Sequence, residues 1–278
     1  MTLIDTSLGE DTNLALPWSE EDEFEELEEL IEDELDDEEE EGELDLSQYT
    51  PEQIKVLKIR YKQAEVLGNL QRSVTLLEGK KGRGKTLAGV AVAYQLKELF
   101  GIPTVVVGTS MDLVRAKYGD FTFLDEKEFI NHLDKLTTVT KNTDEDTVRD
   151  AIEETLKTMG VSVTNACMVF DEAYKFFDSR TPSDKLVRVF GYFVAQSRHY
   201  KCSIILLCPF RDMIDKRVRR QIDFYGRCFT SNKTHITTVR LSGGMDSWKL
   251  KIFGPNYWDM YDTHALVGFR AKHLMINV

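Results

Sequence analysis

The sequence predicts an α/β protein whose mostly parallel, doubly wound sheet is covered by helices on both faces. Two observations support this fold class. Short, continuously apolar runs indicate strands buried on both faces, and helix-like segments stand between them along the chain. A third observation concerns the region after residue 225. There polar and apolar residues alternate, which predicts a C-terminal β-hairpin added at one edge of the sheet.

The first predicted element is a helix over residues 50–70. Thr50 suits its N-cap, Pro51 its first helical position and Glu52 its first turn. Strands and helices then alternate in chain order. They are predicted at 73–79 (strand), 85–100 (helix), 103–109 (strand), 126–138 and 145–159 (helices), 166–173 (strand), 184–199 (helix), 202–208 (strand), and 226–241 with 247–254 (hairpin region).

The charge divides the chain into two parts. Residues 1–54 contain 23 Asp or Glu and no Lys or Arg, so that segment carries −23. Of the chain's 48 acidic and 35 basic residues, 25 and 35 remain, so the rest carries about +10. We therefore predict an acidic low-complexity tail over residues 1–49 and one folded domain over 50–278.

Dense like charge predicts that the tail is solvated and disordered. An alternative stays open, because four apolar residues in the tail fall at helical spacing: Phe24, Leu27, Ile31 and Leu35. On that interpretation a short acidic helix docks on a basic partner or shields the basic part of the same chain.

Several classes of protein are disfavoured. The N-terminus lacks the charged and apolar regions of a signal peptide, and no run reaches the roughly 20 apolar residues of a membrane helix. The four cysteines form no Cys-x-x-Cys pair, and the five histidines are scattered along the chain. We therefore expect a soluble protein of a reducing compartment, without a metal–thiolate site.

A glycine-rich loop follows the first predicted strand and precedes a helix. Its residues match the P-loop (Walker A) pattern GxxxxGK[ST]. Glycines let backbone N–H groups surround phosphate oxygens, and the helix N-terminus favours the same anion. The alternative is a plain glycine-rich turn, but the flanking strand and helix favour ATP and Mg²⁺. The predicted binding residues are Gly79, Lys80, Lys81, Gly82, Arg83, Gly84, Lys85 and Thr86.

A second motif (Walker B) ends the apolar strand "ACMVF" with Asp171 and Glu172. An aspartate at a strand end provides the second Mg²⁺ contact of P-loop NTPases, and a neighbouring glutamate can orient or deprotonate water. The alternative is an ordinary strand followed by an acidic helix cap. The Asp-Glu pair favours hydrolysis over phosphotransfer to a small molecule.

A basic cluster follows the strand at 202–208. It admits three interpretations, which the sequence leaves open: contacts to DNA phosphates, an arginine that completes a neighbouring subunit's site, or a solvated face paired with nearby aspartates. Its members are Arg211, Lys216, Arg217, Arg219 and Arg220, with Asp212, Asp215 and Asp223 as the acidic neighbours.

The order of these segments resembles the FtsK–HerA superfamily of DNA-pumping ATPases. After the P-loop come "FDEAYKFFDSR", "FVAQSRHYKCSIILLCPF", "RDMIDKRVRRQID" and "MYDTH". Over about residues 70–265 the chain is similar to genome-packaging ATPases of tailless, membrane-containing viruses and to zonular-occludens-toxin-like phage proteins. The resemblance implies a RecA-like core and a ring of identical subunits that pumps double-stranded DNA into a capsid in the host cytoplasm or at a virion vertex. The charge of the acidic tail suggests two roles in such a motor: it occupies the DNA channel until packaging starts, or it docks on a basic capsid or portal protein.

Carried over by position, the resemblance implies that Lys85 and Thr86 take the phosphate and Mg²⁺ roles, Asp171 the metal role and Glu172 the base role. It makes Arg198 a catalytic candidate, as the finger of a neighbouring subunit's site. Pro209 departs from the pattern, because a polar sensor usually stands there. The rival functions are a phage assembly and export ATPase, a small-molecule phosphotransferase and a non-hydrolysing switch.

Overall fold

The computed structural model describes residues 50–108, 121–124, 129, 145–158, 160, 162–180, 185–231 and 233–260. Its internal packing divides the chain into two units, residues 1–62 and 63–278. The acidic tail, the predicted helix at 126–138 (apart from Phe129) and the end of the "MYDTH" segment lie outside the described residues. The domain boundary at residue 49 and the tail's disorder stay predictions.

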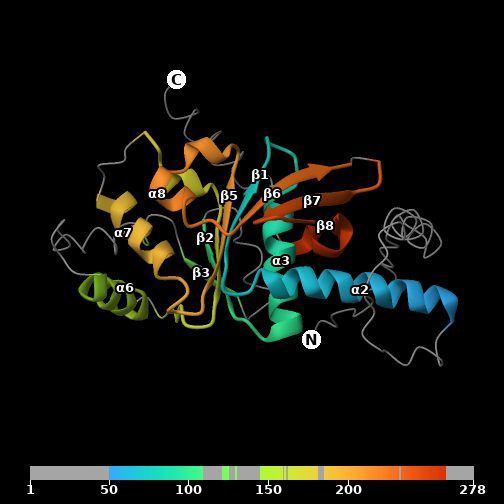
Figure 1. The fold of residues 1–278 in the computed structure, drawn as a ribbon, viewed down its shortest axis with the longest axis horizontal. Coiled ribbons are helices and arrows are strands. Elements are labelled where there is room, and N and C mark those ends of the chain that lie inside the picture. The colour runs from blue at the N-terminus through green and yellow to red at the C-terminus, as the bar shows by residue number, and fades with distance from the viewer. Residues whose placement is uncertain are drawn as a thin grey trace, which may run out of the picture. The chain divides into compact units, whose positions relative to one another are not determined.

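The second unit is built on an eight-stranded sheet in the order β3-β2-β4-β5-β1-β6-β7-β8 (Figure 1). The pairings from β3 to β6 are all parallel, whereas β6–β7 and β7–β8 are antiparallel. The strands are β1 (Val74–Glu78), β2 (Thr104–Val107), β3 (Phe121–Leu124), β4 (Cys167–Phe170), β5 (Ser203–Cys208), β6 (Phe224–Thr230), β7 (Ile236–Gly243) and β8 (Asp246–Phe253).

This sheet confirms the predicted fold class, with two differences. The C-terminal region contributes three strands, and its first strand, β6, continues the parallel sheet beside β1 before the chain reverses. Strand β3 was not predicted, because "FTFL" is short and follows a segment without a clear period.

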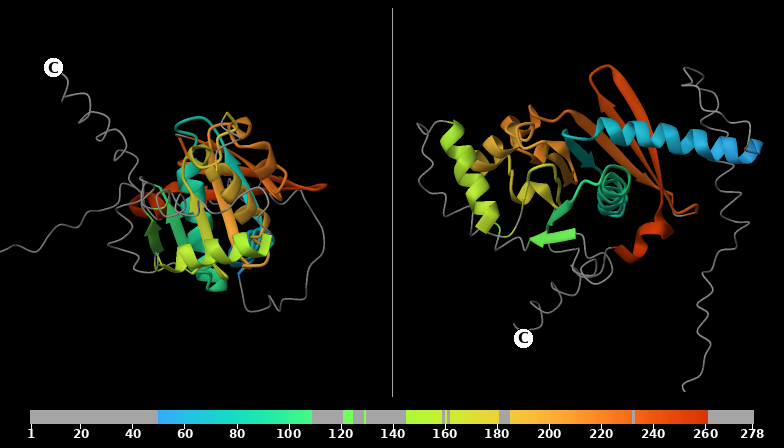
Figure 2. Two further views of the ribbon diagram at one scale, coloured as in Figure 1. Left: turned by 90° about the vertical axis from the view of Figure 1, so that its left-hand side faces the viewer. Right: turned by 90° about the horizontal axis from the view of Figure 1, so that it is seen from below.

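Helices cover both faces of the sheet. Helix α3 lies on one face, and α6, α7 and α8 lie on the other (Figures 1 and 2). The helices are α2 (Pro51–Asn69), α3 (Lys85–Phe100), α6 (Glu145–Thr158), α7 (Lys185–Ala195) and α8 (Lys216–Arg219), with the short 3₁₀ helices η1 (Ala173–Lys175), η2 (Arg211–Met213) and η3 (Gly254–Met260). The end of α2 that belongs to the second unit packs with α3 through Val66, Leu67 and the following Leu70.

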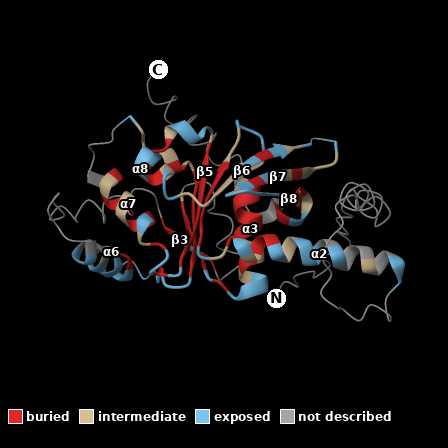
Figure 3. Ribbon diagram, viewed as in Figure 1, coloured by how far each residue is buried: buried red, intermediate tan, exposed pale blue. Residues whose placement is uncertain are grey.

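The core explains the continuous apolar strands. Strands β2, β4 and β5 are buried on both faces, as parallel strands between helices are (Figure 3). On the α7 face, five phenylalanine rings stack edge to face or tilted around β4, with neighbouring centroids 5.0 to 6.4 Å apart. They are Phe129, Phe170, Phe176, Phe177 and Phe190.

Helix α7 ends at Ala195, four residues before the predicted end. After it the chain forms tight turns, with the Ser197 N–H bonded to the Val194 carbonyl and the His199 N–H to that of Gln196. The Cys202 N–H then bonds back to the Ser197 carbonyl, which directs the chain into β5. Residues 196–200, including Arg198, therefore belong to a turned connection.

Candidate nucleotide-binding site

The two nucleotide motifs lie at the same edge of the sheet. Strands β1, β4 and β5 are parallel, so the residues that follow them emerge at one carboxyl edge. Gly79 follows β1, Asp171 follows β4, and Pro209 follows β5, which stands between the other two. This is the arrangement of a P-loop NTPase.

The P-loop backbone is shaped for an anion. Gly82 and Gly84 both have φ 77°, a left-handed conformation that glycine adopts without strain. Gly84 is the N-cap of α3, no side chain caps that helix, and the Ala88 N–H begins it by donating to the Gly84 carbonyl at 2.8 Å. The first amides of α3 therefore have no intrahelical acceptor, which suits them to an anion in the loop. Lys85 Nζ donates across the loop to the Lys80 carbonyl at 3.4 Å.

Strands β6 and β7 contact this loop at Gly84, through Thr230 and Thr237. The hydroxyls of Thr230 and Thr237 are 2.7 Å apart and share a hydrogen bond. A Cβ at Gly84 would overlap Thr230 Oγ1 and would lie 2.6 Å from Thr237 Oγ1. Only glycine fits at this position, because both the backbone angle and the available space exclude a side chain.

Asp171 and Glu172 are held in a constrained turn. Asp171 is 6% exposed, its N–H donates to the Val107 carbonyl, and its Oδ1 accepts the Glu172 N–H at 3.0 Å. A Cβ at Gly108, which has φ 148°, would lie 3.1 Å from Asp171 Cβ. Glu172 itself has φ 53°, which costs a residue with a side chain roughly 1–2 kcal/mol. Strain of this kind concentrates at functional sites.

These residues fit a Mg²⁺–nucleotide. Thr86 and Asp171 offer a hydroxyl and a carboxylate oxygen, the hard donors that Mg²⁺ takes. The glycine-rich loop presents backbone amides that no side chain caps. Pro209, at the position where a polar sensor was expected, offers neither an N–H nor a polar side chain. Arg211 stands two residues further on, and its N–H donates to Glu78 Oε2 at 3.3 Å.

The basic cluster is tied to the segment after Glu172. Asp178 forms an isolated antiparallel bridge with Ile214, and the Asp215 N–H donates to the Phe177 carbonyl at 2.6 Å. The cluster therefore lies at the carboxyl edge, on the Asp171 side. Two of its arginines pair within the cluster: Arg217 with Asp215 at 2.9 Å and Arg219 with Asp212 at 2.7 Å.

The Arg217 pair affects the titration of Asp215. Burial raises the pKa of that carboxyl, and the hydrogen bonds from Arg217 lower it by more, so the net pKa is below the usual value. Arg220 is exposed, and no ion pair of its side chain is found within the described residues. Arg217 and Arg219 thus pair with nearby aspartates, as the solvated-face interpretation expects. Arg211 and Arg220 stay candidates for contact with DNA or with a neighbouring subunit's site.

Arg198 is not brought together with the other predicted site residues. Its guanidinium donates to Asp223 Oδ1 at 2.9 Å, and Asp223 Oδ2 accepts the N–H of Val74, the first residue of β1. This is the amino edge of the sheet, about 16 Å from the P-loop along the five residues of β1. Within this chain Arg198 does not reach Lys85 or Glu172, so a role as a finger requires a neighbouring subunit.

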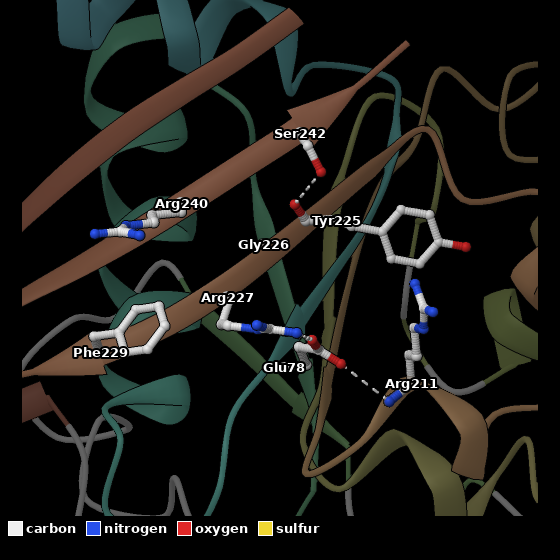
Figure 4. A pocket seen from close by; sticks show the side chains of 8 residues that line it. All are labelled: Glu78, Arg211, Tyr225, Gly226, Arg227, Phe229, Arg240 and Ser242. Carbon is white, nitrogen blue, oxygen red and sulfur yellow. Dashed lines mark hydrogen bonds and ion pairs between the residues drawn. The ribbon is translucent and has the colours of Figure 1, made fainter. Parts of the chain in front are cut away.

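Sequence reasoning missed a groove beside the P-loop. Two hollows of about 250 and 470 Å³ share Glu78, Arg211, Arg227 and Phe229. Figure 4 shows the residues that line the smaller one. We call their joint lining the arginine groove. Its residues are Glu78, Gly79, Lys80, Arg83, Pro209, Phe210, Arg211, Asp212, Tyr225, Gly226, Arg227, Cys228, Phe229, Arg240 and Ser242. The period-two alternation of β6 and β7 was the available signal, because it places Arg227, Phe229 and Arg240 on one exposed face.

A comparison with protein families finds a match to the zonular occludens toxin (Zot) family over residues 73–239, more than half of the chain. No curated protein sequence matches. Within the described residues, no helix has the length and apolar character needed to cross a membrane.

Three solved structures illustrate the fold similarity. The N-terminal domain of zonular occludens toxin from Neisseria meningitidis is 17% identical, with 69% of this chain and 100% of that chain covered and a TM-score of 0.44. The genome-packaging NTPase B204 from Sulfolobus turreted icosahedral virus 2, in complex with ATP-gammaS, is 12% identical, with 65% and 98% covered and a TM-score of 0.41. The KaiC-like protein PH0186 from Pyrococcus horikoshii OT3 is 15% identical, with 67% and 88% covered and a TM-score of 0.41.

At these identities and TM-scores the three likenesses carry no inference about function. The assignment to a family rests on the family match and the observed sheet. Both nucleotide motifs lie inside the matched range, on a P-loop NTPase core. The chain therefore belongs to the zonular occludens toxin (Zot) family.

Proposed function

We propose that this protein hydrolyses ATP with Mg²⁺ and couples the hydrolysis to the movement of double-stranded DNA. The observation that carries the hydrolytic part is the convergence of the P-loop and the Asp171–Glu172 turn on one edge of the sheet. A binding module needs only the first of these; a hydrolase also needs a group that positions water.

The residues divide the chemistry among them. The amides at the start of α3 and the Lys85 ammonium bind the phosphate chain, and Thr86 and Asp171 would hold Mg²⁺. Bound Mg²⁺ neutralises charge that develops on the phosphate oxygens. Glu172, fixed by its left-handed backbone and by the bond from its N–H to Asp171, orients the attacking water or accepts its proton.

Charge supports a DNA partner. The chain outside residues 1–54 carries about +10, and its exposed cations include Arg220, for which no ion pair is found within the described residues. Such contacts read phosphate rather than sequence, so we expect binding to be largely sequence-neutral. Arg198 lies at the opposite edge of the sheet, away from the P-loop of its own chain. Its side chain is 78% exposed, so a neighbouring subunit in a ring could contact it.

Two routes for the DNA remain as proposals. The first is packaging into a capsid, in the host cytoplasm or at a virion vertex. The second is a phage assembly and export ATPase, and the match to the Zot family over residues 73–239 specifically favours it. Both routes require the same ATPase.

The test is the ATPase rate with and without long double-stranded DNA, over a series of salt concentrations. We expect stimulation that decreases as salt rises, because phosphate contacts release counterions. Lys85→Ala should abolish ATP binding, whereas Glu172→Gln should retain ATP and lose turnover. Robust hydrolysis that ignores DNA at every salt concentration would refute the DNA-coupled function and favour a membrane-assembly ATPase or a small-molecule phosphotransferase. Retained turnover in Glu172→Gln would remove Glu172 from the water-activating role.

A further inference from the structure

Strands β6, β7 and β8 present one buried face and one exposed face. Cys228, Val239, Leu241 and Leu250 are buried and pack with α3 and its surroundings. The residues between them point the other way, since side chains alternate along a strand. Along each of the three strands, exposed positions alternate with buried ones, so the exposed side chains gather on the face opposite α3.

The strand register aligns three cations across this exposed face. Arg227 on β6 lies opposite Arg240 on β7, and Arg240 lies opposite Lys249 on β8. Like charges directly opposite each other destabilise a sheet. A row of three is therefore a cost to folding, which a bound polyanion would remove.

The row continues into the arginine groove on one side. Glu78, paired in register with Arg227, accepts hydrogen bonds from Arg227 Nε and Nη2 at 3.1 and 3.0 Å. Arg211 stands beside it and lines both hollows. With strands about 4.8 Å apart, the distance from β1 to β8 is about 14 Å. Cations spread over this distance suit several successive phosphates better than a single one.

Aromatic rings stand among these cations. Phe229 is 40% exposed and Phe210 is 53% exposed, and both line the same hollow with Arg211 and Arg227. The Arg240 guanidinium lies over the Phe229 ring, 5.5 Å from its centroid (Figure 4). Exposed rings and guanidinium planes beside backbone-binding cations are the elements of a stacking platform for bases.

We propose that the arginine groove and its continuation onto Lys249 bind a single strand of nucleic acid. Phosphates contact Arg227, Arg240 and Lys249, and unpaired bases stack against Phe210 and Phe229. Paired bases are stacked inside a duplex and do not offer their faces to such rings, so the aromatic component favours single strands over duplex. This inference goes beyond the proposed function, because it concerns an unpaired strand and applies to either route for the DNA.

The groove also adjoins the nucleotide site, since Glu78 immediately precedes Gly79 and the groove includes Lys80 and Arg83. A phosphate that takes Arg227 competes with Glu78 for that guanidinium. Strand binding is thus placed to alter the last residue of β1, directly before the P-loop.

The test measures equilibrium binding by fluorescence anisotropy on the full chain without ATP, so that a failed ATPase leaves the result readable. The probes are a labelled oligothymidylate of about 20 nucleotides, a duplex of the same length and polyglutamate. We expect the single strand to bind more tightly than the duplex. Arg240→Gln should weaken binding about 3- to 10-fold and reduce the salt slope by about 0.7.

Phe229→Leu separates stacking from charge. We expect it to weaken single-strand binding about 5- to 100-fold and leave the salt slope unchanged. Phe100→Leu is the matched control, because Phe100 is 38% exposed at the end of α3, outside the groove; Lys157→Ala on α6 controls for loss of charge. Circular dichroism on every variant checks that it is folded.

Three results would overturn the proposal. They are equal affinity for single strand and duplex, equal effects of Phe229→Leu and Phe100→Leu, and binding of polyglutamate as tight as that of oligothymidylate. The last result would identify a surface for an acidic protein segment.

Discussion

Gly82 and Gly84 allow a quantitative test of how the P-loop is supported. Both glycines have φ 77°, so replacement by alanine places the same strain on each backbone, roughly 1–2 kcal/mol. Their surroundings differ. A Cβ at Gly82 meets nothing within 4 Å, whereas one at Gly84 would lie 2.6 Å from Thr237 Oγ1 and 2.8 Å from Thr237 Cγ2.

The difference between the two variants therefore isolates the contact with Thr230 and Thr237. To accept the methyl group of Gly84→Ala, these hydroxyls must give up their 2.7 Å hydrogen bond or the loop must rise from β6 and β7. Overpacking of this kind costs about 1–3 kcal/mol. We expect Gly82→Ala to lower the free energy of unfolding by about 1–2 kcal/mol and Gly84→Ala by about 2–5 kcal/mol.

Urea unfolding followed by circular dichroism measures both losses, and the restriction of the unfolded chain by alanine is common to the two variants. Binding of a non-hydrolysable ATP analogue should fall more steeply in Gly84→Ala, because its loop is displaced from β6 and β7. The double variant Thr230→Ala with Thr237→Ala should recover part of the loss in the Gly84→Ala background. Equal destabilisation by the two glycine variants would refute the proposed support of the loop.

Three further predictions concern other parts of the chain. Deleting residues 1–46, which hold most of the chain's excess acid, should raise DNA affinity at low salt in anisotropy titrations; unchanged affinity would exclude shielding by the tail. Burial raises the pKa of the Cys202 and Cys228 thiols to about 12. Both thiols should thus resist alkylation by iodoacetamide at pH 8 until urea is added, as mass spectrometry would show. The free energy of unfolding should decline as the pH rises above 9.0, the ordinary thiol pKa, because the thiols then ionise only in the unfolded chain. Arg198→Ala removes an ion pair whose arginine is 78% exposed, so it should cost under about 1 kcal/mol of stability. Asp223→Ala also removes the acceptor of the Val74 N–H, so it should cost about 1–3 kcal/mol. If Arg198 acts on a neighbouring subunit, Arg198→Ala should lose ATP turnover despite this small change, and normal turnover would end that role.

Local patterns accounted for most of the elements. The helix Lys85–Phe100 has the predicted bounds, and the strands around residues 74–78, 167–170 and 203–208 lie inside the predicted ones. These signals depend on neighbours in sequence: a helix start after glycine, or an apolar run that ends in Asp-Glu. The early end of α7 was not predictable in this way. The carbonyl of Ser197 accepts a hydrogen bond from the Cys202 N–H, before β5, and that of Tyr200 accepts one from the Asn165 N–H, before β4.

The sequence by itself determined that a phosphate loop and an Asp-Glu turn follow two buried strands, because each motif occupies a few consecutive residues. Only the tertiary structure decided what surrounds them. It placed β5 between the two motif strands, sent Arg198 to the far edge of the sheet, and aligned Arg227, Arg240 and Lys249 across three strands. The physical reason is that strand order and register depend on pairings between distant segments, and a shift of one residue would turn each side chain to the other face.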